Sequence, residues 1–239
     1  MDSIKINSLQ TKIVAHRGLS GIELENTNAA FIAAGNRSYF GIETDVHKTA
    51  DGKFVVFHDD QTGRVCDTNV TVEETEFAYL RALHLNDKEA DATRADMLIP
   101  TLKEYIATCR RYEKIAVLEL KNEFTKDEIA AICDEIKELD YLSNVSFISF
   151  CFANMNRLRE LYPQQTAQFL TSVYQSDLPQ ILEAHKLDID IEYSQLNEER
   201  IKAFHDRGVK VNCWTCDDKD FAENLAAWGI DYITSNILE

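Results

Sequence analysis

Two acidic residues alternate with uncharged ones in the short run Ile42-Glu43-Thr44-Asp45-Val46. Alternate side chains of a strand point to the same face, so Glu43 and Asp45 share one face of the strand that this run predicts. A later strand-like run places Glu119 and Lys121 on one face in the same way. Buried like charges are costly unless a cation or a proton compensates them. Three carboxylates converging at one rim therefore predict a divalent cation with oxygen ligands, Mg²⁺ or Ca²⁺.

The alternative for these carboxylates is a structural ion-pair network with Arg17 and Lys121. Two bases do not neutralise three acids, which favours the metal site. Arg17 is also a candidate phosphate clamp, because a guanidinium can pair with two phosphoryl oxygens. Its alternative role is counter-ion of Glu43.

Two histidines complete the candidate site. His16 ends the first predicted strand, and His58 ends a strand-like run, residues 54–58, that a hairpin joins to the second strand. If the turn centres on Asp51-Gly52, antiparallel pairing brings His58 opposite Asp45. Both imidazoles then reach one bound substrate, and histidine titrates nearest neutral pH, so the pair suits acid and base catalysis. Taken alone, each histidine is more often a structural or surface residue.

The remaining aromatic, histidine and cysteine residues carry weaker signals. Trp214, inward at the end of the seventh predicted strand, is a candidate roof of a substrate pocket, with plain core packing as the alternative. Cys213 and Cys216 have the spacing of a redox or zinc-binding pair. A redox pair needs a helix N-terminus at its first cysteine and a zinc site needs a second ligand pair, and neither is present, so the six cysteines are interpreted as reduced thiols. The other histidines are interpreted as non-functional: His47, His84, His185 and His205.

The elements that position these residues alternate along the whole chain. Short runs rich in Val, Ile and Phe alternate with helical patterns of ten or more residues, which is typical of βα units. The predicted strands are residues 13–17, 41–47, 115–120, 145–150, 167–171, 187–192, 209–214 and 232–235. The predicted helices are residues 28–37, 126–139, 152–161, 178–185, 198–206 and 219–227, with one more behind the capping box Thr101-x-x-Glu104.

Eight strands and seven intervening helices in 239 residues match an α/β fold, the (β/α)8 TIM barrel, with the last helix short or missing. A doubly wound open sheet is the structural alternative. We expect a single domain over residues 1–239, with the hairpin after the second strand and a small insertion, residues 61–99, over the barrel mouth. The insertion holds a predicted helix behind Thr71-x-x-Glu74 and an acidic stretch from Asn86 to Asp96.

Composition excludes several classes of partner. The chain has 25 Lys and Arg against 41 Asp and Glu, a net charge of −16, and no basic cluster, so nucleic acid is not an expected partner. No window approaches about 18 consecutive apolar residues, and residues 1–12 contain no signal-like hydrophobic stretch. We therefore expect a cytoplasmic protein without membrane insertion.

A set of short motifs occurs in order between residue 13 and about residue 122. They are Ala15-His16-Arg17-Gly18, Glu25-Asn26-Thr27, Ile42-Glu43-Thr44-Asp45-Val46, Thr49-Ala50-Asp51-Gly52, Val55-Val56-Phe57-His58-Asp59, Ile99-Pro100-Thr101-Leu102 and Leu118-Glu119-Leu120-Lys121. This set resembles the glycerophosphodiester phosphodiesterase family, and the likeness resumes more weakly at residues 149–150 and 211–215. The ordered combination is highly specific, unlike any one motif alone.

The resemblance implies a (β/α)8 barrel that hydrolyses glycerophosphodiesters, small phosphodiester substrates, to glycerol 3-phosphate and an alcohol with a divalent metal. It implies these roles: Glu43, Asp45 and Glu119 as metal ligands, His16 and His58 as the acid and base pair, Arg17 and Lys121 as phosphate contacts, and Trp214 as a substrate-side aromatic. Two features depart from the family pattern. Ser235-Asn236 stands where an Asp is usual, and the insertion is short and lacks the usual Gly-rich start.

Two other functions remain open. A lysophospholipase D or a sphingomyelinase D-like phosphodiesterase uses the same constellation but needs an apolar channel or a membrane-docking surface, and the acidic stretch argues against anionic membranes. A barrel retained only for binding or scaffolding is the non-enzymatic alternative, although every motif residue is present.

Overall fold

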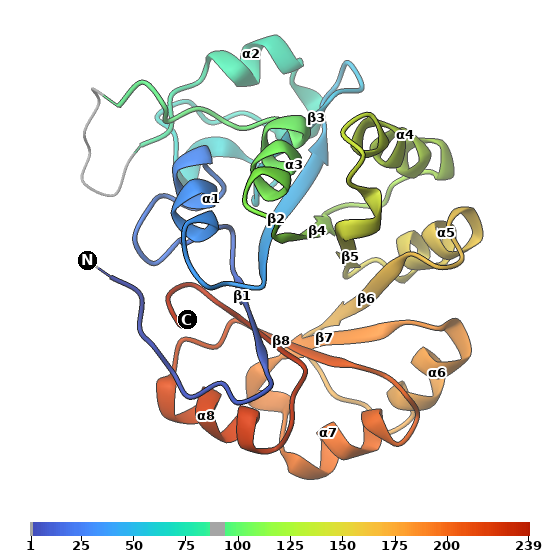
Figure 1. The fold of residues 1–239 in the computed structure, drawn as a ribbon. Helices are drawn as coiled ribbons and strands as arrows, with labels where there is room; N and C mark the ends of the chain where they lie inside the picture. Colours follow the sequence, from blue (N-terminus) through green and yellow to red (C-terminus); the bar gives the residue numbers. More distant parts are fainter. Residues whose placement is uncertain (1, 87–93) are drawn as a thin grey trace.

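The computed structural model describes residues 2–86 and 94–239 and contains a nearly closed barrel of parallel strands (Figure 1). The strands are β1 (Lys12–Ala15), β2 (Gly41–Lys48), β3 (Phe54–Val56), β4 (Ile115–Leu120), β5 (Val145–Ser149), β6 (Thr166–Thr171), β7 (Asp188–Glu192), β8 (Val211–Trp214) and β9 (Tyr232–Ser235). Their order is β8-β7-β6-β5-β4-β2-β1-β9, with β3 antiparallel to β2. Between β8 and β9, the hydroxyl of Thr234 donates to Asn212 Oδ1 at 3.2 Å.

Helices cover the outside of this barrel, as Figure 1 shows. The covering helices are α1 (Asn28–Gly35), α3 (Leu102–Arg111), α4 (Lys126–Lys137), α5 (Phe152–Leu161), α6 (Leu178–His185), α7 (Glu198–His205) and α8 (Lys219–Ala227). A shorter helix, α2 (Phe77–Ala82), lies in the segment 61–99, and the 3-10 turns are η1 (Thr62–Arg64), η2 (Val72–Glu74), η3 (Leu142–Asn144) and η4 (Tyr193–Gln195). The predicted strands all occur, with bounds within two residues of those observed. The barrel is therefore confirmed over the open sheet.

The main core lies between the strands and the helices. On β2, the outward residues Ile42 and Val46 are fully buried against this layer, while Glu43 and Asp45 face the barrel interior. Two helices that cover the layer begin at capping boxes: the predicted one at Thr101 and another at Thr125 both form reciprocal side-chain bonds. This packing fixes which face of each strand is available to the site.

The helix predicted behind Thr71 begins later than expected. Thr71 makes no side-chain cap bond, a 3-10 turn covers Val72–Glu74, and the α-helix begins only at Phe77. The interruption is Thr75, which is extended, with φ −112° and ψ 140°, and whose carbonyl accepts from the backbone N–H of Ala50 in the hairpin. This hydrogen bond to the hairpin occupies the Thr75 carbonyl, which would otherwise accept a hydrogen bond within a continuous helix.

The buried apolar residues that the structure describes in the segment 61–99 pack in a cluster of their own on the hairpin. Val72, Leu80, Met97 and Ile99 are buried there with Val55 of β3. Residues 87–93 of the predicted acidic stretch Asn86–Asp96 lie outside the described residues. None of the helices in the described ranges is both long and apolar enough to span a membrane.

The register of the hairpin differs from the predicted one by one residue. Val46 pairs with Val56 and Lys48 with Phe54, so the residue facing Asp45 is Phe57, whose N–H donates to the Asp45 carbonyl at 3.1 Å. The prediction that His58 lies opposite Asp45 is therefore wrong. The physical reason is the loop: Thr49 N–H donates to the Lys53 carbonyl at 2.8 Å, which leaves three loop residues rather than two.

Candidate active site

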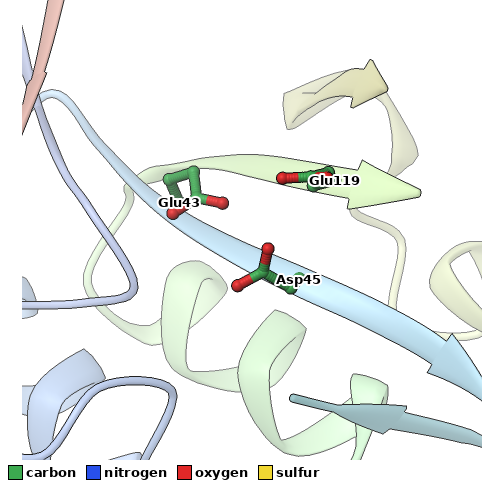
Figure 2. A group of neighbouring side chains, drawn as sticks. All are labelled: Glu43, Asp45 and Glu119. Atoms are coloured by element: carbon green, nitrogen blue, oxygen red, sulfur yellow. The ribbon is translucent and has the colours of Figure 1, made fainter. Parts of the chain in front are cut away.

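The three predicted ligand carboxylates lie on two neighbouring strands. β2 and β4 pair in parallel with Asp45 opposite Glu119, and Glu43 lies two residues earlier on β2. Their residues are nearly inaccessible, with exposed fractions of 3% for Glu43, 1% for Asp45 and 7% for Glu119. One carboxylate oxygen from each lies within 4.8 Å of the other two, and Figure 2 shows the three groups together on β2 and β4.

The burial of these three carboxyl groups next to one another makes it unfavourable for all of them to be ionised. Burial, with the charge of Asp45 added, raises the pKa of Glu43 well above its ordinary value and that of Glu119 to about 8. Burial opposes ionisation of Asp45 as well, yet Lys121, Arg17 and His58 hold the pKa of Asp45 below its ordinary value. The cluster is thus short of positive charge.

The cationic side chains next to the carboxylate cluster only partly neutralise its negative charge. Lys121 Nζ lies 3.4 Å from Asp45 Oδ1 and 3.1 Å from Glu119 Oε1, and Arg17 Nε lies 3.7 Å from Asp45 Oδ2. The contacts of the ion-pair alternative are therefore present, but neither base forms an ion pair with Glu43. An all-oxygen donor set with residual negative charge fits a hard cation such as Mg²⁺ or Ca²⁺.

Arg17 is held in an uncommon backbone conformation. Its φ is 53°, and its N–H donates to Glu43 Oε2 at 2.8 Å. Gly18, at φ 78°, follows, where an added Cβ would lie 2.7 Å from Ala30. The guanidinium donates to Glu25 at 2.8 Å, while its Nε has no hydrogen-bond partner. Strain of this kind persists only where the surroundings enforce it and is concentrated at functional sites.

Both predicted histidines are present, and each has one ring nitrogen engaged. His16 Nδ1 lies 2.8 Å from Asn236 Oδ1, an acceptor, so the ring proton sits on Nδ1, and Nε2, 3.9 Å from Glu43 Oε2, accepts no hydrogen bond from the described residues. His58 Nδ1 lies 2.6 Å from Asp59 Oδ1. Burial lowers the pKa of His16 to about 4, helped by Arg17, and burial also lowers the pKa of His58. His58 reaches the site although β3 ends two residues before it.

Seven of the eight predicted site residues line one cavity, and Asp45 adjoins it through the carboxylate cluster. Inward side chains of an eight-stranded barrel form layers of four from alternate strands. The floor layer of this cavity is Glu43, Ile148, Asp190 and Thr234. The next layer is His16, Glu119, Leu170 and Trp214, and the other lining residues are Arg17, His58, Lys121 and Phe150.

Trp214, at the end of β8, packs in the barrel and also lines the cavity. Its ring packs edge-on against Phe150 with centroids 5.4 Å apart and also covers the inner apolar cluster of the barrel. It lines the cavity, and its indole Nε1 has no hydrogen-bond partner. The half of the cavity that Trp214 shares with Ile148, Phe150 and Leu170 is apolar, opposite the charged half.

Sequence reasoning missed several residues that position the site. Asn26 donates to Asp45 Oδ2 at 2.7 Å and accepts from Thr44 at 2.6 Å. Asp59, next to His58, is itself fixed by Arg64 Nε at 2.6 Å. Asn26 lies in the motif Glu25-Asn26-Thr27 and Asp59 directly follows His58, so their places in the motifs are the signal that could have indicated a positioning role. Asp190 is a further inward acid, on β7, and the alternation of that strand is the signal that could have found it.

The Ser235-Asn236 departure has a structural counterpart in Asp217. The Asp217 carboxylate accepts from the Ser235 hydroxyl at 2.7 Å, from the Asn236 N–H at 2.7 Å and from the Asn236 amide at 2.6 Å. It thereby fixes the amide that meets His16. The Asp217 carboxylate is therefore linked to the His16 imidazole through the Asn236 amide and is not itself hydrogen-bonded to the ring.

Comparisons with known proteins point to one family. A model described as the glycerophosphoryl diester phosphodiesterase family matches residues 16–238. The putative glycerophosphodiester phosphodiesterase YhdW of Bacillus subtilis is 30% identical over 236 residues, covering 94% of this chain and 93% of that protein. A glycerophosphodiester phosphodiesterase of Caldanaerobacter subterraneus is 26% identical, covering 95% of each chain. The structure of an Oleispira antarctica phosphodiesterase in complex with the product sn-glycerol-3-phosphate is similar, with a TM-score of 0.87, 28% identity and coverage of 98% and 96%.

Proposed function

Because this chain belongs to the glycerophosphoryl diester phosphodiesterase family, we propose that it hydrolyses glycerophosphodiesters to glycerol 3-phosphate and an alcohol. The observation that carries the proposal is the cavity in which His16, His58, Arg17 and Lys121 surround the carboxylate cluster. The relative solved with glycerol 3-phosphate supports a small phosphodiester as the substrate.

Glu43, Asp45 and Glu119 would hold a divalent cation, Mg²⁺ or Ca²⁺, which supplies stabilisation of the charge that builds on the phosphoryl oxygens. Arg17 and Lys121 bind the same phosphoryl oxygens. The unpartnered Nε of Arg17 gives it a donor beyond those already engaged with Glu25. The two bases therefore orient the phosphodiester and offset its charge.

His16 acts as the base in this mechanism. A pKa of about 4 leaves its imidazole neutral at pH 7, and its free Nε2 accepts a proton from the glycerol 2-hydroxyl. The hydroxyl oxygen then attacks phosphorus and the bond to the alcohol breaks, which gives a cyclic phosphate.

His58 acts as the acid, donating a proton to the leaving alcohol oxygen. Burial lowers the pKa of His58, and the charge of Asp45 and the Nδ1 contact with Asp59 oppose this by stabilising the protonated ring. Water opens the cyclic phosphate with the roles exchanged: His58 takes a proton from water, and His16 returns one to the 2-hydroxyl oxygen. Both histidines then regain their starting protonation states.

A second candidate activity is that of a lysophospholipase D or a sphingomyelinase D-like phosphodiesterase. The observation that favours it is the apolar half of the cavity, where Phe150 is 45% exposed beside Trp214. An acyl chain would lie along such a wall.

The test is a panel of glycerophosphodiesters with choline, ethanolamine, glycerol and inositol head groups, together with lysophosphatidylcholine. Chelator-treated protein is assayed with Mg²⁺ or Ca²⁺ restored separately. Release of glycerol 3-phosphate only after a cation is restored is the expected result. A panel without any turnover would overturn the proposal.

A further inference from the structure

A buried acid, Asp190, lies on the floor of the cavity and has no role in the mechanism above. It comes from the middle of β7, in the same inward layer as Glu43, and its exposed fraction is 1%. Leu170 and Trp214, on the two strands that flank β7, belong to the next layer toward the mouth. Asp190 thus lies at the base of the apolar half of the cavity.

The carboxyl of Asp190 is unsatisfied. Its Oδ1 has no hydrogen-bond partner. The polar residues nearby bond to one another instead: Asn212, its register partner on β8, donates to Gln168 at 3.2 Å and accepts from Thr234 at 3.2 Å. A buried polar atom without a partner costs free energy and needs an explanation in a native structure.

The chemistry of the cavity limits what can meet this carboxyl. The cations Arg17 and Lys121 and the carboxylate cluster that binds a cation lie on the side of β1, β2 and β4, which places the phosphate there. The cavity-lining residues of the two strands that flank Asp190 are Leu170 and Trp214, which offer no counter-charge. Burial raises the pKa of Asp190 well above its ordinary value, and a neutral carboxyl both donates and accepts. Its partner is therefore an uncharged polar group on the organic part of the substrate.

We propose that Asp190 is a specificity-determining residue that hydrogen-bonds the terminal, non-reacting hydroxyl of the glycerol moiety. The inference rests on the proposed function, because a glycerophosphodiester has two free hydroxyls and the mechanism uses the one next to the phosphate-bearing carbon. The other hydroxyl extends away from the phosphate, across the floor, toward β7. Trp214, whose Nε1 also lacks a partner, lines the same part of the cavity.

The consequence is selection against lysophospholipids. A 1-acyl lysophospholipid carries an ester where a glycerophosphodiester carries this hydroxyl, so it cannot donate a hydrogen bond there and adds a chain that must cross the same floor. Sites built to hydrogen-bond a substrate hydroxyl reject analogues that lack it, because the buried polar group is left unpaired. Asp190 thus opposes the lysophospholipase D activity that the apolar wall favours.

The test compares kcat/KM for glycerophosphocholine with that for a short-chain 1-acyl lysophosphatidylcholine in Asp190→Ala and Asp190→Asn, each loaded with the divalent cation. In Asp190→Ala we expect the preference for glycerophosphocholine to fall about ten-fold or more, while Asp190→Asn, which keeps a donor and an acceptor, retains most of it. Asp188→Asn, on the same strand but outside the cavity lining, is the matched control and should retain the wild-type ratio.

Binding gives a readout independent of turnover. By calorimetry, sn-glycerol 3-phosphate should bind Asp190→Ala about ten-fold more weakly than wild type, and inorganic phosphate equally well. Equal losses for both substrates and both ligands, or no loss at all, would overturn the inference. Failure of the proposed function is separate, because it would appear as wild-type protein that turns over no glycerophosphodiester.

Discussion

Asp45 and Glu119 are register partners across β2 and β4, and both carboxyl groups are buried with one ammonium, that of Lys121, between them. Glu43 adds a third buried carboxyl on the same strand as Asp45. Without a further cation, the folded protein compensates this charge by holding protons. The cluster therefore lowers stability wherever those protons are lost and no metal replaces them.

Replacement of Glu119 by Gln should separate metal binding from stability. In chelator-treated protein at pH 9, above the pKa of about 8, Glu119→Gln removes a buried charge, and we expect its thermal midpoint to exceed that of wild type by a few degrees, or about 1 kcal/mol. Divalent-cation affinity, measured by calorimetry, should fall at least about ten-fold because a ligand is lost. The exposed Glu123→Gln is the control and should change neither quantity. A lower midpoint for Glu119→Gln would contradict this account of the cluster.

The stability of the metal-free protein should fall as pH rises. The pKa of Glu119, about 8 when folded, lies above its ordinary value of 4.5, and that of Glu43 is raised too, so the folded state binds more protons than the unfolded state in this window. Unfolding then becomes easier from about pH 6.5 to pH 8, because below about pH 6.5 the lowered pKa values of His16 and His58 change stability in the opposite direction. The pKa of Asp45 is lowered, so Asp45 changes stability only at acidic pH, below its ordinary pKa. Urea unfolding at several pH values, with and without cation, measures the effect, and saturating cation should flatten the profile.

The residues that one strand positions by alternation were predictable from sequence. A period of two places Glu43 and Asp45 on one face whatever the tertiary context, and the βα alternation places that face inside a barrel. The same period applies to Asp190, but alternation gives only the face. Whether neighbouring strands supply a hydrogen-bond partner depends on Asn212 and Thr234, which bond elsewhere.

Turn geometry and long-range hydrogen bonds limited the other predictions. The residues Asp51-Gly52 are compatible with a two-residue or a three-residue hairpin loop. The backbone hydrogen bond between Thr49 and Lys53 determines which register forms. The helix predicted at Thr71 fails because Ala50, distant in sequence, bonds the Thr75 carbonyl. Local patterns do not contain these contacts.

His58 is expected to be essential for turnover and dispensable for metal binding. His58→Ala should reduce kcat by about 10²- to 10⁴-fold, the usual contribution of general acid–base catalysis. Divalent-cation affinity should change by less than about three-fold, because the oxygen ligands of the cluster remain. The exposed His185→Ala, on α6, is the matched control. Wild-type turnover in His58→Ala would contradict the assigned role.

The contact between Asn236 and His16 provides a pH-dependent test of the base. In the double variant Asn236→Asp with Asp217→Asn, the carboxylate and the amide exchange places, so a negative charge meets His16 Nδ1 while the bond between positions 217 and 236 is kept. That charge stabilises the imidazolium and raises the pKa of His16 by about one to three units. Because the base must be neutral, the acid limb of kcat/KM should move upward in pH by the same amount. The single variant Asp217→Asn keeps a neutral amide at His16 and should leave the limb near its wild-type position. An unmoved limb in the double variant would mean that a group other than His16 controls it.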